Sequence, residues 1–201
     1  MIANDIGVVI LAGGEATRLP EKLSLAVGNI PMIARVYRNV SPRRETAISC
    51  KSTFPPEIDA LLLAPMVVDR WSRRGPLSGM VTTMEQMRSP FVFAVAGDAP
   101  FIDATFIDAL AANYAEGDDA IVPMHPERRG KTAIEPLAAI YDRRAFLREA
   151  LPVLARGDAA LRAVIDRLNA RFVPVNDERI FANVNTNDDY VRLQAQLGQH
   201  G

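Results

Sequence analysis

Short apolar runs alternate along the chain with segments whose apolar residues recur at helical spacing. The run over 91–96 is apolar throughout, which is typical of a strand that is covered on both faces. Similar runs are predicted to be strands, at 7–11, 46–50, 66–68 and 120–123. Helices are predicted between them, at 31–40, 56–63, 77–87 and 104–114.

This alternation weakens after residue 123. The pattern predicts a strand over 136–141, for which an antiparallel direction is open, and a short strand over 171–175. Helices are expected at 143–155, 159–169 and 188–196. Strands that alternate with helices of about ten residues indicate βαβ units. We therefore expect an α/β fold with a doubly wound, mostly parallel sheet flanked by helices, formed as a single domain over 1–201.

Composition narrows the chemistry that such a fold could carry. The chain has 201 residues and a formal net charge of −1, so no basic field attracts nucleic acid or an anionic membrane. One cysteine, Cys50, and two histidines, His125 and His200, exclude a disulfide framework and a cysteine- or histidine-rich metal site. A bound metal would be held by carboxylates, which favours a hard ion such as Mg²⁺.

The apolar runs are too short for a membrane-spanning helix, which needs about 18–20 residues. The first of them follows Asn4 and Asp5 rather than a basic segment, unlike the start of a signal peptide. We therefore expect a cytoplasmic protein that has neither a membrane nor a nucleic acid as partner. Cys50 is expected to be a small buried residue, and His125 a loop residue.

Ligands of open α/β sheets bind beyond the carboxyl ends of the strands, which here are the segments 11–22, 50–53, 69–79 and 97–101. In the first segment, a pair of glycines follows the strand directly, and Arg18 and Lys22 come shortly after. Glycines let backbone N–H groups approach a ligand closely, and two cations suit a polyphosphate. The alternative is a tight surface loop whose cations are solvated.

Two aspartates end apolar strands at this edge of the predicted sheet. Asp98 follows the run over 91–96 and Asp69 follows the run over 66–68, so we expect both to face one site from neighbouring strands. A carboxylate opposite the cationic loop suits Mg²⁺ bound to phosphate oxygens. The alternative for Asp98 is a helix cap or a turn, because aspartate is common in turns.

A late polar segment has a different pattern. Asn183 and Asn185 are two residues apart, so they share a face of an extended segment, and two amides on one face suit hydrogen bonds to a polar heterocycle. Thr186 and Asp189 have the spacing of a helix-capping box, with aspartate in place of glutamate. Capping explains these two residues but leaves Asn183 unexplained.

Together these motifs resemble a family of nucleotidyltransferases, the molybdenum cofactor guanylyltransferases. Leu11-Ala-Gly-Gly14, with Arg18 and Lys22, looks like the signature loop of that family. Later segments look like its other motifs, namely Gly75-Pro-Leu-Ser-Gly79 (Gly-Pro-Leu-Ala-Gly in the family), Gly97-Asp-Ala-Pro-Phe101, Glu135-Pro-Leu137 and Asn183-Val-Asn-Thr186. The last of these indicates the guanylyltransferase branch.

The resemblance implies a Rossmann-like nucleotide-diphospho-sugar transferase fold. It implies a reaction in which GMP passes from GTP to the molybdopterin cofactor, with release of pyrophosphate. The backbone of Leu11, Ala12 and Gly13 would hold the guanine nucleotide. Lys22 would contact its phosphates, and Arg18 is expected to assist Lys22 in catalysis.

The resemblance also assigns the remaining candidate residues. Asp69 would help to hold GTP, and Asp98 would bind both GTP and Mg²⁺. Lys51 stands where the family carries an asparagine, and we count it among the nucleotide-binding residues. Asn183 and Asn185 would bind the pterin. The implied partners are the two substrates and the proteins that supply the cofactor or the molybdoenzymes that accept the product.

Two other functions stay open from the residues alone. A cytidylyl- or sugar-phosphate nucleotidyltransferase would use the same glycine loop. A non-catalytic nucleotide-binding protein is the second, and Lys22 and Asp98 argue against it, because a sensor could dispense with the metal.

Overall fold

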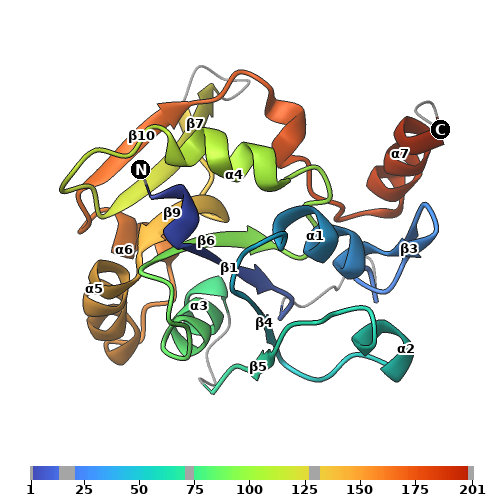
Figure 1. Ribbon diagram of the computed structural model, residues 1–201, viewed down its shortest axis with the longest axis horizontal. Coiled ribbons are helices and arrows are strands. Elements are labelled where there is room, and N and C mark those ends of the chain that lie inside the picture. Colours follow the sequence, from blue (N-terminus) through green and yellow to red (C-terminus); the bar gives the residue numbers. More distant parts are fainter. Residues whose placement is uncertain (1, 14–20, 71–74, 127–131, 199–201) are drawn as a thin grey trace.

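One mixed sheet forms the centre of the fold (Figure 1). The computed structural model describes residues 2–13, 21–70, 75–126 and 132–198. Eight strands form the sheet, in the order β10-β7-β9-β6-β1-β4-β5, with β8 paired to β7. Their bounds are β1 Ile6–Leu11, β4 Thr46–Cys50, β5 Met66–Val68, β6 Phe91–Ala96, β7 Ala120–Pro126, β8 Thr132–Ile134, β9 Ala138–Asp142 and β10 Ala170–Pro174.

Most neighbouring strands of this sheet run in parallel. β1 pairs in parallel with β4 and β6, β4 with β5, and β10 with β7. Among the described strands, β9 and β8 run against their neighbours. The prediction of a doubly wound, mostly parallel sheet is confirmed, and the late strand takes the antiparallel direction that the sequence left open.

Helices cover both faces of the sheet because successive residues of the central strands point to opposite sides. The helices are α1 Met32–Val40, α2 Pro56–Asp59, α3 Pro76–Met84, α4 Ala104–Ala111, α5 Arg143–Ala155, α6 Leu161–Ile165 and α7 Asn187–Gly198. In β1, Val8 and Ile10 pack with residues of α1 and α4, whereas Val9 packs with residues of α3, α5 and α6. Within the described residues, no helix is long and apolar enough to cross a membrane.

Several predicted bounds are wrong, for identifiable reasons. The helix expected over 56–63 ends at Asp59, and Leu63 is 86% exposed, so the apolar residues that suggested a longer helix do not all pack. β7 continues to Pro126 because it also pairs with β8, a strand that the sequence pattern did not predict. His125 therefore lies in a strand and not in a loop.

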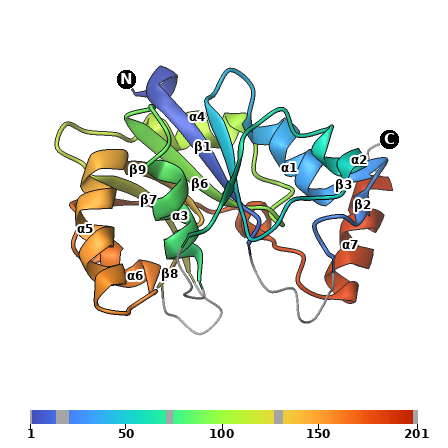
Figure 2. The same cartoon turned by 90° about the horizontal axis from the view of Figure 1, so that it is seen from below.

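A small hairpin also escaped prediction, because its strands β2 (Ala26–Val27) and β3 (Ile30–Pro31) are too short to show a period. The helix α7 lies beside this hairpin (Figure 2). Tyr190 Oη and Gln194 Nε2 donate to the carbonyl oxygen of Ala26 at 2.5 and 2.6 Å. Val27, Met32, Val184 and Leu193 form a separate buried cluster between them. The C-terminal segment is thereby fixed to the chain that follows the glycine loop.

At the opposite edge of the sheet, one carboxylate joins the start of β4 to the start of β6. Glu45 accepts hydrogen bonds from the backbone N–H of Arg88 at 3.0 Å and from the N–H and hydroxyl of Ser89 at 2.7 and 2.6 Å. Burial by itself raises the pKa of Glu45, but these hydrogen bonds outweigh it and hold the pKa below its ordinary value of 4.5.

We expect Glu45→Gln to lower the stability by about 1 kcal/mol near neutral pH, or roughly 2–4 °C in Tm, because the ionised acceptor is lost. Since the folded pKa is lowered, this stabilisation is complete above pH 4.5 and is lost as the pH falls through the folded pKa. Thermal unfolding at neutral and acidic pH measures it. The exposed Glu116→Gln variant is the control, and an unchanged difference in Tm between variant and wild type at acidic pH would contradict this account.

Candidate active site

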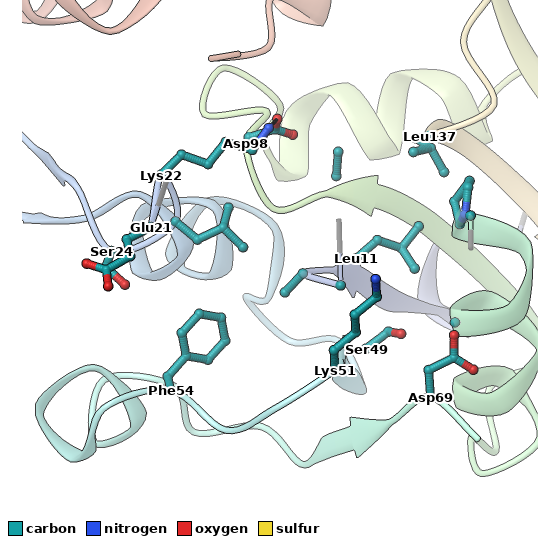
Figure 3. Close-up of a pocket in the computed structure, with 17 residues that line it drawn as sticks. Leu11, Glu21, Lys22, Ser24, Ser49, Lys51, Phe54, Asp69, Asp98 and Leu137 are labelled. Carbon is teal, nitrogen blue, oxygen red and sulfur yellow. Dashed lines mark hydrogen bonds and ion pairs between the residues drawn. The ribbon is translucent and has the colours of Figure 1, made fainter. Parts of the chain in front are cut away.

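The carboxyl ends of the central strands open onto a cavity of about 500 Å³ (Figure 3). Its walls come from the ends of β1, β4, β5 and β6, from the start of α3 and from the segment after the glycine loop. Seven residues that the sequence nominated line it, namely Leu11, Ala12, Gly13, Lys22, Lys51, Asp69 and Asp98. The rule that ligands bind at this edge of the sheet therefore located the cavity.

Lys22 and Asp98 form an ion pair at one end of the cavity. Asp98 lies two residues after the end of β6 and is 8% exposed, whereas Lys22 comes from the chain before the hairpin. Lys22 Nζ also donates to Asn185 Oδ1 at 3.0 Å. The pair thus brings together three segments that are far apart in the sequence.

The segment that carries Asn185 is held against the same corner. The backbone N–H of Val184 donates to the carbonyl oxygen of Asp98 at 3.2 Å, and the Val184 side chain is buried. Asn183 and Asn185, on either side of it, are exposed. Neither is among the residues that line the described cavity, and a shared face for the two side chains stays a prediction.

The turn after Asn185 is the capping box that the sequence predicts. The N–H of Asp189 donates to Thr186 Oγ1 at 3.2 Å, and the N–H of Thr186 donates to Asp189 Oδ2 at 2.9 Å. Hydrogen bonds from the Thr186 hydroxyl and from the N–H of Asn185 hold the pKa of Asp189 below its ordinary value. This box fixes the start of α7 and, with it, the position of Asn185.

Asp69 lies at the other end of the cavity from Asp98 (Figure 3). Both face the cavity, but the expectation that they come from neighbouring strands is wrong, because β1 and β4 lie between β5 and β6. Ser78 Oγ donates to Asp69 Oδ2 at 2.5 Å, and Thr82 Oγ1 donates to Asp69 Oδ1 at 3.2 Å. The carboxylate is therefore held by α3.

Glycines explain why α3 can approach the sheet so closely. Gly75, just before the helix, has a φ of +129°, which few other residues adopt. A Cβ at Gly79 would lie 3.3 Å from Leu11 Cδ2 and would collide with Ser49 Oγ. The glycines of the Gly75-Pro-Leu-Ser-Gly79 motif thus shape the wall of the cavity.

Some lining residues were missed in the sequence. Phe54, Ser24 and Ser49 line the cavity without having been nominated, and Glu21 and Leu137 line it although no role of their own was predicted for them. Ser49 is the penultimate residue of β4 and Phe54 lies just past the segment 50–53, so attention to the residues around each strand end could have found them. Arg18 and Gly14, which the sequence did nominate, lie outside the described residues.

Asp98 is the residue that the sequence nominated to hold Mg²⁺. Among the described residues, no group of three or more histidine, cysteine, aspartate or glutamate side chains could hold a metal. Proteins commonly bind Mg²⁺ through one or two carboxylates together with water and substrate phosphates. A single carboxylate beside a lysine at the edge of a cavity fits a metal that arrives with a polyphosphate.

The contacts of Cys50 and His125 account for both residues without a catalytic role. Cys50 is 1% exposed, and burial raises the pKa of its thiol, so the expectation of a small buried residue is confirmed. His125 Nε2 lies 2.7 Å from Glu135 Oε1, and its ring stacks on that of Phe181 at 5.5 Å between centroids.

Comparison with known proteins identifies the family of this chain. Residues 8–172 match the model of the MobA-like NTP transferase domain. The chain belongs to this family, and it is therefore a nucleotidyltransferase. The outcome agrees with the resemblance that the motifs suggested.

Curated relatives agree with the family over nearly their whole length. A protein of Natronomonas pharaonis named "Probable molybdenum cofactor guanylyltransferase" is 27% identical, and the match covers 94% of this chain and 96% of the relative. One of the same name from Methanosarcina acetivorans is 28% identical over 94% of this chain and 89% of the relative.

Solved structures share the fold. Molybdopterin-guanine dinucleotide biosynthesis protein A from Archaeoglobus fulgidus is 25% identical, with a TM-score of 0.78 over 96% of this chain and 99% of the other. The 2-C-methyl-D-erythritol 4-phosphate cytidylyltransferase from Thermus thermophilus is 15% identical, with a TM-score of 0.75 over 96% and 98%. The Rossmann-like nucleotidyltransferase fold is thus confirmed, while the fold alone does not distinguish GTP from CTP.

Proposed function

We propose that this nucleotidyltransferase transfers GMP from GTP to the molybdopterin cofactor and releases pyrophosphate. The observation that carries the proposal is the meeting of Lys22, Asp98 and Asn185 at one corner of the cavity. At this corner a lysine that follows the glycine loop meets a carboxylate suited to Mg²⁺ and an asparagine of the segment before α7. The names of the curated relatives and of the Archaeoglobus protein support the same substrates.

In the proposed reaction, a terminal phosphate oxygen of the pterin attacks the α-phosphorus of GTP. A new P–O bond forms, the bond between the α-phosphorus and its bridging oxygen to the β-phosphate breaks, and pyrophosphate carries away the electron pair. The attacking phosphate is already ionised, so no strong general base is needed. Catalysis then consists of positioning and charge neutralisation.

Different lining residues of the cavity would bind different parts of the nucleotide. The backbone of Leu11, Ala12 and Gly13 approaches the nucleotide, and Lys51 and Asp69 hold it from the ends of β4 and β5. The proposal takes residues 1–201 as a single nucleotidyltransferase domain.

Lys22 would neutralise charge on the phosphates, with Arg18 beside it in the sequence. Asp98 would hold Mg²⁺, which when bound neutralises phosphate oxygens that the lysine does not reach. In the described structure, Lys22 binds both Asp98 and Asn185. If Asp98 held the metal, Lys22 would still have its hydrogen bond to Asn185 and further N–H donors for the phosphates.

Asn183 and Asn185 are proposed to bind the pterin. Both are exposed, Asn185 accepts a hydrogen bond from Lys22 beside Asp98, and neither lines the cavity that would hold the nucleotide. Contact with proteins that supply the cofactor, or with molybdoenzymes that accept the product, belongs to the same proposal. So does a cytoplasmic location, with which the free and buried Cys50 is compatible.

We expect Asp98→Asn to reduce Mg²⁺-dependent transfer by about a thousandfold or more, because loss of the metal ligand removes several kcal/mol of charge stabilisation. Pyrophosphate release at saturating GTP measures the rate. Asp108→Asn is the control, because Asp108 is exposed and forms an ion pair with Arg44, and neither residue lines the cavity. Turnover near that of the wild type in the Asp98 variant would show that the metal assignment is wrong.

We expect Asn183→Ala to weaken pterin binding by roughly tenfold, the size of one lost hydrogen bond, and to leave GTP affinity unchanged. Separate titrations of the two ligands measure this, with the exposed Asn176→Ala as control. A loss confined to GTP would move the asparagine to the nucleotide. A large fall in Tm would instead favour a structural role for Asn183 in the turn before α7.

A further inference from the structure

The side chain of Asp69 is anchored before any ligand arrives. Its backbone N–H donates to the carbonyl oxygen of Cys50 at 3.0 Å, which extends the pairing of β4 and β5 by one residue. Its carboxylate accepts one hydrogen bond on each oxygen from α3, from Ser78 on Oδ2 and from Thr82 on Oδ1. Backbone and side chain are thus both fixed at the wall of the cavity.

Both anchoring hydroxyls are buried. Ser78 is 0% exposed and Thr82 is 2% exposed, and as residues four apart they lie on one face of the helix. A buried hydroxyl without a partner is costly, so these groups hold the carboxylate firmly. Ser78 has a single hydrogen to donate, and its 2.5 Å contact with Asp69 is much shorter than its 3.2 Å contact with the carbonyl oxygen of Gly75.

We propose that Ser78 and Thr82 are positioning residues that orient Asp69 toward donor groups of the nucleotide. The inference rests on the proposed function, which gives Asp69 a role in nucleotide binding. A carboxylate oxygen can accept more than one hydrogen bond, so a carboxylate that is held from α3 can also bind donor groups of a nucleotide. Without an anchor, the carboxylate can rotate away from that orientation.

The helix provides its own control. Thr83 is 0% exposed and lies next to Thr82, but its hydroxyl has no hydrogen-bond partner among the described residues. Thr82→Val and Thr83→Val each remove a buried hydroxyl from adjacent positions of the helix. Of these two, only the Thr82 hydroxyl donates to Asp69 among the described contacts. Thr82→Ser keeps the hydroxyl and removes a methyl group instead.

GTP titration with Mg²⁺ present, together with steady-state rates, tests the proposal. We expect Ser78→Ala and Thr82→Val each to raise the Kd of GTP by about tenfold, with kcat at saturating GTP nearly unchanged, because the contact is made in ground and transition states alike. Thr82→Ser and Thr83→Val should bind GTP as the wild type does. If Ser78→Ala does not fold, the Thr82 variants decide the question.

A double-mutant cycle separates positioning from packing. In an Asp69→Ala background, Ser78→Ala should cause no further loss of GTP affinity, because there is no carboxylate left to orient. If Asp69→Ala weakens binding while Ser78→Ala and Thr82→Val do not, the positioning role is wrong and the nucleotide role of Asp69 stands. If Asp69→Ala binds GTP as the wild type does, both the positioning role and that part of the proposed function are overturned.

Discussion

A charged carboxylate beside an apolar sheet must be compensated, and this requirement organises the active site. Asp98 is 8% exposed at the end of the central strand β6. An unpaired charge that is largely buried costs several kcal/mol, and Lys22 provides the opposite charge. The residue next to the lysine is tied to α1, since the N–H of Ile33 donates to the carbonyl oxygen of Leu23 at 3.1 Å, and Asn185 binds the same ammonium group. Substrate phosphates and a metal would enter a site whose charges are already arranged.

The C-terminal helix maintains this arrangement although it is remote in sequence. Its residues Tyr190 and Gln194 bind the hairpin, and Leu193 packs with Val27 and Met32 in a cluster separate from the two main cores. The segment before the helix supplies Val184 and Asn185 to the corner at Asp98. The lysine and the asparagine that meet there are therefore held by one structural unit.

Much of the fold could be predicted because buried parallel strands are continuous apolar runs. β4, β5 and β6 have the predicted bounds, and the residues after them line the cavity. The order of strands in the sheet cannot be read from such runs, which is why Asp69 and Asp98 were wrongly expected on neighbours. The hairpin was missed because two-residue strands have no period. The anchoring of Asp69 did have a signal, since Ser78 and Thr82 are spaced by one helical turn.

The cavity is proposed to select GTP for transfer to the molybdopterin cofactor, although the fold is shared with a cytidylyltransferase of known structure. Pyrophosphate release, measured for GTP, CTP, ATP and UTP in turn with Mg²⁺ and molybdopterin, tests this selection. We expect turnover with GTP and little with the other three. Turnover with CTP in place of GTP would identify a cytidylyltransferase, and nucleotide binding without pyrophosphate release would contradict the proposed transfer altogether.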